Sequence, residues 1–235
     1  GQSRSLIMGG LAIDGAAKKL TEKLKSIVGR LLQTSPSALQ LSDGNFVNPL
    51  TGQNISLGQI AQAATPEEGP LECAFTAPQT AMTFPHGCHI CELEVDPATG
   101  AIDICNYVAA DDFGNVVNPM LCQGQVHGAV VQGIGQVLLE SIVYEEETGQ
   151  LLSGSLMDYC LARADHVPSI NVELVDDAPC LTNAMGAKGA GEAGTIAAPP
   201  AVMNALVDAL APLGIDNLDM PATPLKVWRA IQDAN

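Results

Sequence analysis

Basic side chains are scarce in this sequence, in which 10 Lys and Arg residues stand against 26 Asp and Glu residues for a net charge of -16. Such an acidic chain repels phosphate groups, so nucleic acid and an anionic membrane are poor partners. Long apolar runs are also missing, because no stretch approaches the roughly 20 residues that a membrane helix needs. No signal segment, with basic residues ahead of an apolar run, opens the chain. We therefore expect a cytoplasmic protein without a membrane span.

The sequence also lacks the pattern of a disulfide-bonded protein. The seven cysteines are an odd number scattered through apolar stretches, which predicts reduced, mostly buried thiols in place of a disulfide framework. Cys88-His89-Ile90-Cys91 resembles a metal or redox pair, but no second pair follows at the spacing of a zinc site. The alternation that continues into Val95 predicts a strand with Cys88 and Cys91 on opposite faces. A structural role is favoured, and we assign no metal ligand in this chain.

Hydrophobic residues, by contrast, are abundant, and at 47% of 235 residues they suffice for a substantial core. Helical and alternating periodicities follow one another along the chain, with turn residues between them. The expected elements are a helix within Leu6–Gln33 after an early small-residue turn, a hairpin at Asp43-Gly44, a helix from Ser56 through Ala64, strands over 88–95, 101–110 and 170–175, and helices over 122–144, 201–210 and 224–231.

This mixture of elements predicts an α+β fold with mixed sheets and packed helices. Pro, Gly and Glu residues concentrate in Thr65–Pro70, which makes this stretch the best internal boundary. We expect a helix-rich N-terminal segment over residues 1–66 and an α+β portion over residues 67–235.

The stretch 186–200 combines glycines with a single carboxylate. Glycines at 186, 189, 191 and 194 surround Glu192, and Pro199-Pro200 suits the first turn of the helix expected over 201–210. A carboxylate ahead of a helix N-terminus is stabilised by free amides and by the positive end of the helix dipole. This pattern favours a ligand-facing acid or base, with a tight structural turn as the alternative.

Other patterns are weaker. Gly189–Gly194 formally matches the dinucleotide motif, but no strand directly precedes it and no acidic residue stands about 20 positions on at the end of a second strand, so a nicotinamide site is only a third option. Gly154-Ser155 lacks the second glycine of a nucleophile elbow. His127 is expected to pack or to lie on a helix surface.

The helix expected over 122–144 carries glycines at 124, 128, 133 and 135, so a cofactor or another backbone can lie against its first half. Gln123, Gln125 and Gln132 on the same helix offer uncharged donors and acceptors to a polar ligand. Taken alone, such amides are ordinary polar residues of a helix.

Three stretches in collinear order together resemble the molybdenum hydroxylases, the family of xanthine dehydrogenase, aldehyde oxidase and aerobic carbon monoxide dehydrogenase. They are Gly1-Gln-Ser-Arg-Ser5 before a long helix, Asn118–Gly128 leading to Gln132-Gly133, and Gly186–Thr195, and the likeness continues to Met220–Pro224 and Trp228-Arg229. The chain is similar to the C-terminal part of the molybdopterin-binding large subunit.

The resemblance implies a molybdopterin-dependent oxidoreductase in which Glu192 is the general base on a molybdenum-bound hydroxide. Hydride passes to a sulfido ligand, water supplies the inserted oxygen, and two electrons leave through the pterin to iron-sulfur clusters and flavin. The cofactor would be molybdenum-molybdopterin, in its plain or cytosine dinucleotide form. By the same matching, Gln125 binds the cofactor or an oxo ligand, and Lys188, Gly189, Ala190 and Gly191 approach it through backbone amides. Ser3, Arg4 and Ser5 bind its pterin and phosphate end.

Several parts of such an enzyme are missing from this sequence. The [2Fe-2S] cysteine clusters, the flavin segment and the segments that close the other side of the molybdenum site are absent. We therefore expect a fragment or one part of a split large subunit, active only with a complementary molybdopterin-binding chain, an iron-sulfur subunit and an FAD subunit. The substrate would be a small N-heterocycle or aldehyde. The alternative is a noncatalytic assembly subunit of the same fold.

Overall fold

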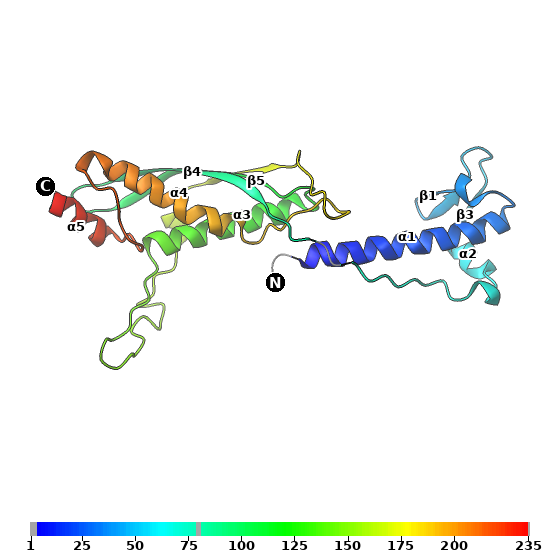
Figure 1. The fold of residues 1–235 in the computed structure, drawn as a ribbon, viewed down its shortest axis with the longest axis horizontal. Helices are drawn as coiled ribbons and strands as arrows, with labels where there is room; N and C mark the ends of the chain where they lie inside the picture. The colour runs from blue at the N-terminus through cyan, green and yellow to red at the C-terminus, as the bar shows by residue number, and fades with distance from the viewer. Residues whose placement is uncertain (1–3, 79–80, 235) are drawn as a thin grey trace. The chain divides into compact units, whose positions relative to one another are not determined.

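The computed structural model describes residues 4–78 and 81–234, which form two compact units. The N-terminal unit is Ser5–Thr80, and the C-terminal unit is Ala81–Asn235 together with the first four residues (Figure 1). In the sequence, the two units meet at residues 80 and 81, later in the chain than the domain boundary expected after residue 66. That expected boundary stays a prediction.

The N-terminal unit packs a small antiparallel sheet on one long helix. Its elements are α1 (Ser5–Leu31), the 3-10 turn Pro36–Ala38, β1 (Gln40–Ser42), β2 (Asn45–Val47), β3 (Asn54–Ser56), α2 (Leu57–Ala63) and the 3-10 turn Pro66–Glu68. The small-residue turn expected near its start is wrong, because Gly9 and Gly10 lie inside α1. The predicted hairpin is present, with positive φ at Asp43 and Gly44. The helix expected from Ser56 through Ala64 is present as α2, and Ser56 caps it through a capping box with Gln59.

The C-terminal unit contains a mixed sheet. Its elements are β4 (His86–Val95), β5 (Ile102–Asp112), α3 (Pro119–Leu138), the 3-10 turn Ala164–His166, β6 (Ile170–Val175), α4 (Ala193–Leu210), the 3-10 turn Ala211–Leu213 and α5 (Pro224–Ala234). The strand order is β4-β5-β6, with β4 antiparallel and β6 parallel to β5. The prediction of an α+β fold with mixed sheets and packed helices is therefore confirmed.

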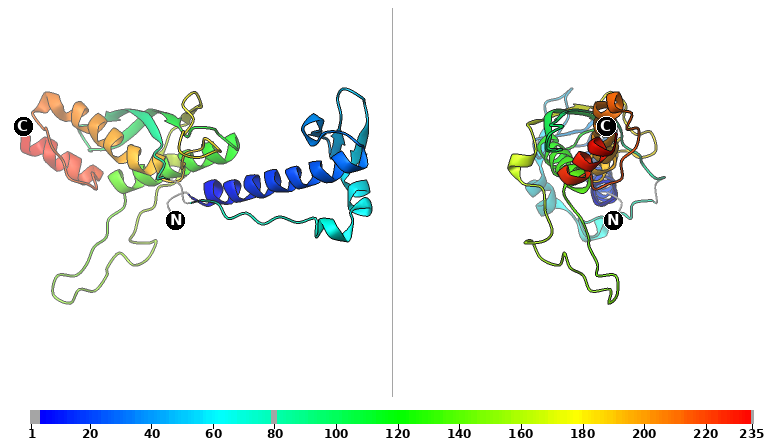
Figure 2. Two further views of the ribbon diagram at one scale, coloured as in Figure 1. Left: turned by 45° about the vertical axis from the view of Figure 1, so that its right-hand side comes forward. Right: turned by 90° about the vertical axis from the view of Figure 1, so that its left-hand side faces the viewer.

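Two helices differ in length from the prediction. α3 begins at Pro119, where the Asn118 side chain caps it by accepting from Leu121 N at 3.1 Å, and it ends at Leu138, before the expected Tyr144. The residues that follow it form a long irregular excursion that projects from the sheet (Figures 1 and 2). α4 begins at Ala193, so Pro199 and Pro200 lie inside this helix and not in its first turn.

Close packing between α3 and α4 explains the early start of α4. A Cβ atom placed on Gly194 would lie 2.8 Å from Ala129 Cβ and 2.9 Å from Val126 O, and one on Gly133 would lie 2.6 Å from Ala198 Cβ. These contacts advance along both helices in the same direction, so α3 and α4 are parallel neighbours (Figures 1 and 2). α4 also contacts β4, and α3 contacts β6. Because α3 starts soon after β5 ends and Gly194 packs beside Val126 and Ala129, both helices begin at the end of the sheet where β5 finishes (Figure 1).

We expect Gly194→Ala to reduce the free energy of unfolding by about 1–3 kcal/mol, because the new methyl group overpacks the contact with Ala129 and the Val126 carbonyl. Gly124→Ala on α3 is the matched control. Its Cβ would meet no atom within 4 Å, so it should be neutral or stabilising by up to about 1 kcal/mol. Chemical denaturation of both variants measures the difference, and equal stability would contradict the packing.

By length and composition alone, the helical stretch Ala193–Leu213 could cross a membrane, with a mean hydropathy of 1.4. The sequence prediction that no stretch approaches this requirement is wrong for this segment. Length and composition are weak criteria for one helix, because a core helix meets them too, and α4 packs against both α3 and β4.

Candidate functional site

The glycine-rich loop, residues 186–192, is joined to the end of β5. Gly186 O accepts hydrogen bonds from Asn115 N at 2.9 Å and from Cys180 N at 2.8 Å, and Gly114 forms an isolated β-bridge with Ala187. Gly114 and Gly186 both have positive φ, and a Cβ on Gly114 would lie only 2.1 Å from Gly186 O. Glycine is therefore required at both positions, and the loop lies at the end of the sheet where α3 and α4 begin.

Lys188 is bound to the same end of β5. Its Nζ forms an ion pair with Asp112, and its backbone N donates to Phe113 O at 2.7 Å. Burial pushes the pKa of the Asp112 carboxyl upward, but hydrogen bonds from Lys188 and from Gly114 N, with the charge of Lys188, outweigh burial and hold this pKa below its ordinary value. The side chain and the amide of Lys188 are thus both used within the chain.

Glu192 is the N-cap residue of α4. Its carbonyl oxygen accepts from Ile196 N at 3.0 Å, but its exposed side chain makes no capping hydrogen bond. An N-cap side chain normally satisfies one of the free amides of the first turn. The Glu192 carboxylate does not do so, and is instead presented to the surroundings at the positive end of α4.

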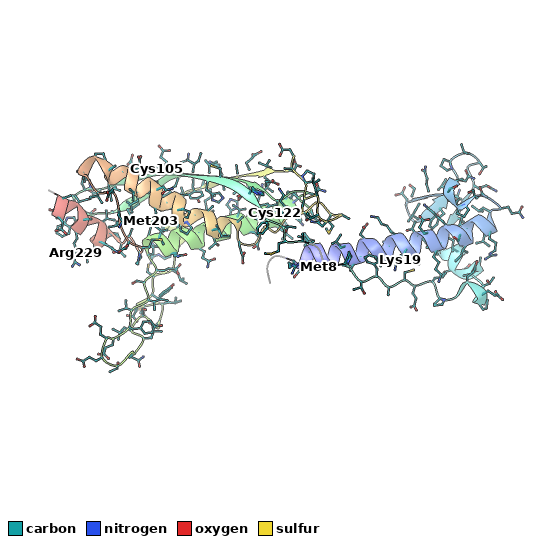
Figure 3. The ribbon with its side chains drawn as sticks, viewed as in Figure 1. Met8, Lys19, Cys105, Cys122, Met203 and Arg229 are labelled. Atoms are coloured by element: carbon teal, nitrogen blue, oxygen red, sulfur yellow. The ribbon has the colours of Figure 1, made fainter. Side chains whose placement is uncertain are left out.

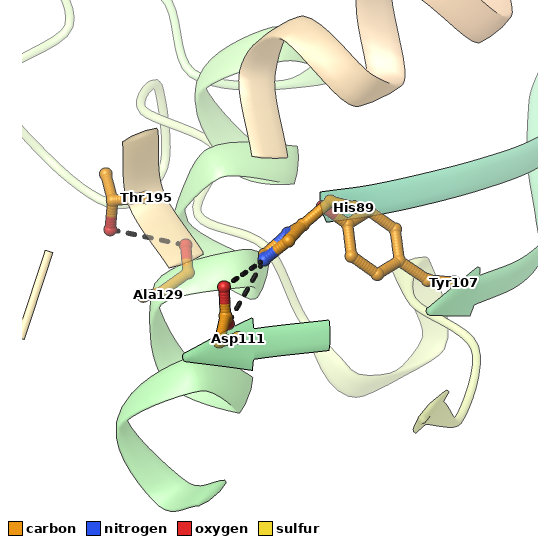
Figure 4. Close-up of polar contacts among 5 residues, drawn as sticks. All are labelled: His89, Tyr107, Asp111, Ala129 and Thr195. Carbon is orange, nitrogen blue, oxygen red and sulfur yellow. Dashed lines mark hydrogen bonds and ion pairs between the residues drawn. The ribbon is translucent and has the colours of Figure 1, made fainter. Parts of the chain in front are cut away.

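Gln125 lies on the turn of α3 that adjoins the start of α4. The carbonyl of the next residue, Val126, is one of the atoms that Gly194 approaches, so the segments carrying Gln125 and Glu192 lie close together. The Gln132 amide accepts from Thr195 Oγ1 at 3.4 Å, and the same hydroxyl donates to Ala129 O at 3.4 Å (Figure 4). In the part of the chain that the structure describes, the exposed Gln125 side chain has no such partner.

The glycines of α3 fall into two groups. Gly133 and Gly135 are buried, and a Cβ on either would lie within 3 Å of another side chain. Gly124 and Gly128 are exposed, and a Cβ on either would meet nothing within 4 Å. Glycine inside a helix costs about 1 kcal/mol relative to alanine, and the contacts of this chain do not explain that cost at Gly124 and Gly128. The first half of α3 is therefore a surface suited to close approach by another group.

The remaining predicted residues lie near the start of the chain. Ser3 is outside the described residues. Ser5 is the first residue of α1, and Arg4 directly precedes it. Arg4 belongs to the same unit as Glu192, whereas Ser5 begins the N-terminal unit, and the role of both residues stays a prediction.

The expectation of mostly buried thiols is wrong. All seven cysteines are free and none is fully buried: Cys88, Cys105 and Cys160 are exposed, and Cys73, Cys91, Cys122 and Cys180 are half-buried. Figure 3 shows Cys105 on β5 and Cys122 on α3. The strand formed by Cys88–Val95 turns Cys91 toward the core, where burial raises the pKa of its thiol to about 11. Of the seven, Cys91 and Cys122 pack against the core of the C-terminal unit.

A buried polar cluster that the sequence did not reveal lies between these cysteines, on β4 and β5. His89 Nδ1 is 2.9 Å from Tyr107 Oη, and His89 Nε2 is 3.2 Å from Asp111 Oδ2 (Figure 4). The His89 and Asp111 side chains are only 1% and 3% exposed, and burial raises the pKa of Tyr107. Gly87 makes room for the carboxylate, since a Cβ there would lie 2.1 Å from Asp111 Oδ1. One feature of the sequence could have indicated this cluster. The alternation of the predicted strand places His89 on the same inward face as Cys91.

These features agree with the comparisons to known proteins. The family model described as a molybdopterin cofactor-binding domain matches residues 1–168, and the chain belongs to this family. It is 36% identical over 99% of its length to the 6-hydroxypseudooxynicotine dehydrogenase complex subunit gamma of Paenarthrobacter nicotinovorans, covering 30% of that relative. It is 30% identical over 99% of its length to the carbon monoxide dehydrogenase large chain of Hydrogenophaga pseudoflava, again covering 30%.

A solved structure has the same fold. The quinoline 2-oxidoreductase of Pseudomonas putida 86 matches 98% of this chain with a TM-score of 0.88 and 30% identity, and 30% of that protein is covered. The chain thus spans about 30% of the length of the curated relatives it matches. The resemblance to the molybdopterin-binding large subunits of molybdenum hydroxylases is confirmed, and the chain corresponds to a part of such a subunit.

Proposed function

We propose that this chain forms one side of the active site of a molybdenum hydroxylase that oxidises a small N-heterocycle or aldehyde. When bound, the molybdenum-molybdopterin cofactor, in its plain or cytosine dinucleotide form, supplies an oxygen that originates from water and takes up two electrons. The observation that carries this proposal is the Glu192 carboxylate, which is exposed at the N-terminus of α4 without a capping hydrogen bond and lies beside the turn of α3 that bears Gln125.

Glu192 would act as the general base. A carboxylate held at the end of a short loop can accept a proton from the group that attacks the substrate, provided that it lies within hydrogen-bond reach. On one side of Glu192, the backbone hydrogen bond from Lys188 N to Phe113 O limits the movement of the loop, and on the other side the packing of Gly194 on α3 does so. This restraint favours a repeated, defined placement of the base.

Other residues of the chain would bind the cofactor. The Gln125 amide offers an NH2 group as donor and a carbonyl oxygen as acceptor, and the exposed glycines Gly124 and Gly128 allow a bulky group to approach α3 closely. Lys188, Gly189, Ala190 and Gly191 would line the cofactor through the loop backbone, although the amide of Lys188 is already donated to Phe113 O. In this proposal Ser3, Arg4 and Ser5 contact the pterin and its phosphate.

Activity would require companion polypeptide, in an assembly that we place in the cytoplasm. A complementary molybdopterin-binding chain would close the other side of the site, and iron-sulfur and FAD subunits would carry the electrons away. Support comes from large apolar side chains that are widely exposed in this chain, which are expected to be covered in a complex. The most exposed are Leu181 at 94%, Met157 at 92%, Leu50 at 90% and Leu156 at 76%.

The test is analysis of the native complex for companion chains, molybdenum and pterin by mass spectrometry and metal analysis. We expect molybdenum and pterin in stoichiometric amounts, and dye reduction with at least one member of a panel of quinoline, 6-hydroxypseudooxynicotine and simple aldehydes. Product formed in isotopically labelled water should carry the label. A complex that lacks both molybdenum and pterin would contradict the proposal and support the noncatalytic assembly subunit.

A further inference from the structure

The Asp112–Lys188 ion pair is a shielded contact between the glycine-rich loop and the end of β5. The two side chains are only 15% and 10% exposed. The Asp112 carboxylate also accepts from Gly114 N at 2.7 Å, so its second oxygen is engaged by the turn that follows β5. A shielded pair of this kind is weakened less by salt than a pair on the surface. The contact therefore holds its partners in one arrangement better than a surface pair does.

Backbone hydrogen bonds join the glycine-rich loop to the end of β5 in addition to this ion pair. Lys188 N donates to Phe113 O, Asn115 N donates to Gly186 O, and Gly114 pairs with Ala187. The side-chain amide of Asn115 adds a hydrogen bond to Met185 O at 2.8 Å. Removing the Lys188 side chain would leave these backbone bonds in place, so its loss should loosen the loop without unfolding it.

Glu192 lies between two fixed points. On one side, Lys188 is tied to β5, and on the other, Gly194 and Ala198 pack α4 against α3. The intervening Gly189, Ala190 and Gly191 carry little side-chain bulk, and glycine restricts the backbone least of all residues. The placement of Glu192 therefore depends on these two anchors, together with the packing of Ala190 against the core between them.

We propose that Asp112 and Lys188 are positioning residues whose ion pair sets the conformation of the glycine-rich loop and thereby the place of the Glu192 carboxylate. This inference rests on the proposed function of Glu192. The inference assigns Asp112 to the Lys188 ammonium group as its partner within the chain. It also predicts that turnover requires Asp112 through the position of the loop, and not through a contact of Asp112 with substrate or cofactor.

The experiment uses Lys188→Gln in the native complex, with Lys188→Arg as the conservative variant. Misplacing a catalytic group by about 1 Å can cost about 100-fold in rate, so Lys188→Gln should lower kcat by about 10–100-fold with KM changed by less than about 3-fold. Molybdenum and pterin content should be unchanged. Lys188→Arg keeps the charge beside Asp112 and should recover most of kcat. Should Lys188→Gln fail to assemble, Asp112→Asn breaks the same ion pair and is measured in the same way.

Hydrogen exchange of the amides over 186–192 gives a readout that does not depend on activity. It should be faster in Lys188→Gln than in the parent complex. Lys18→Gln, which breaks the exposed pair with Asp14 in α1, is the matched control and should change neither exchange in this loop nor kcat. Unchanged kcat and exchange in Lys188→Gln, or activity lost only in proportion to molybdenum, would overturn the inference.

A double variant separates this inference from the proposed function. If Lys188 acts through Glu192, Lys188→Gln should cause little further loss in the Glu192→Gln background, since effects of residues acting as a unit are not additive. Fully additive losses would overturn the positioning role while leaving Glu192 as the base. Turnover retained by Glu192→Gln alone would instead refute the proposed function.

Discussion

Replacing Glu192 by Gln should lower kcat by about 100- to 10,000-fold, the range that a positioned general base contributes. Glutamine keeps the size of the side chain but cannot accept the proton at neutral pH. The exposed position of Glu192 and its lack of a capping hydrogen bond mean that the substitution should leave α4 intact. Dye reduction with the most active substrate of the panel measures kcat, and metal and pterin analysis should show an unchanged cofactor content.

Glu94→Gln is the control for the loss of one carboxylate. Glu94 is exposed on β4 opposite Asp103, at the other end of the sheet from Asp112. We expect its kcat to remain within about 2-fold of the parent value, as for surface substitutions in general. If Glu192→Gln retains parental turnover with molybdenum bound, Glu192 is not the base.

The second large effect is expected from Asp111→Ala. The substitution leaves the His89 ring, which is 1% exposed, without the partner of its Nε2 atom. Losing a neutral buried partner costs about 1–3 kcal/mol, and breaking a charged buried pair costs about 3–5 kcal/mol. Urea denaturation should therefore show a loss of unfolding free energy within these limits. Glu173→Ala, on the exposed face of β6, should stay within about 0.5 kcal/mol.

The double variant His89→Leu with Asp111→Leu tests whether these two side chains depend on each other. Replacing both polar partners by apolar groups removes the unpaired buried atom that each single substitution leaves. Its loss of stability should be clearly smaller than the sum of the two single losses. Additive losses would show that His89 and Asp111 contribute independently.

The glycine-rich loop illustrates what local sequence could and could not predict. The glycines and Glu192 indicated a carboxylate next to a helix start, and Glu192 is indeed the N-cap of α4. The position of that start was misjudged because Pro199-Pro200 is typical of a first turn. The contact between Ala198 and Gly133 favours helix over this stretch, and it joins segments far apart in the chain. Local preferences contain no information about that contact.

The buried cluster was missed for a related reason. The sequence Cys88-His89-Ile90-Cys91 resembles a metal or redox pair, and His89 was interpreted only as a part of that pair. Its hydrogen-bond partners, Tyr107 and Asp111, lie on the next strand. The register of β4 and β5 decides this contact, and a β-bulge shifts that register at Glu92/Leu93. Strand alternation predicted the inward face but could not identify the neighbours across it.

The parallel pairing of β6 with β5 has a consequence for folding. Residues 113–169, which include α3 and the long excursion, must close into a loop before β6 can add to the sheet. Closing a long loop costs entropy before the contacts are gained, so sheets with such distant partners form slowly. The antiparallel β4 and β5 should associate early, and the β6 edge of the sheet, which α3 contacts, should be completed late. The first half of α3, which carries Gln125, lies inside this loop, so the candidate site should take its final form only after β6 has added to the sheet.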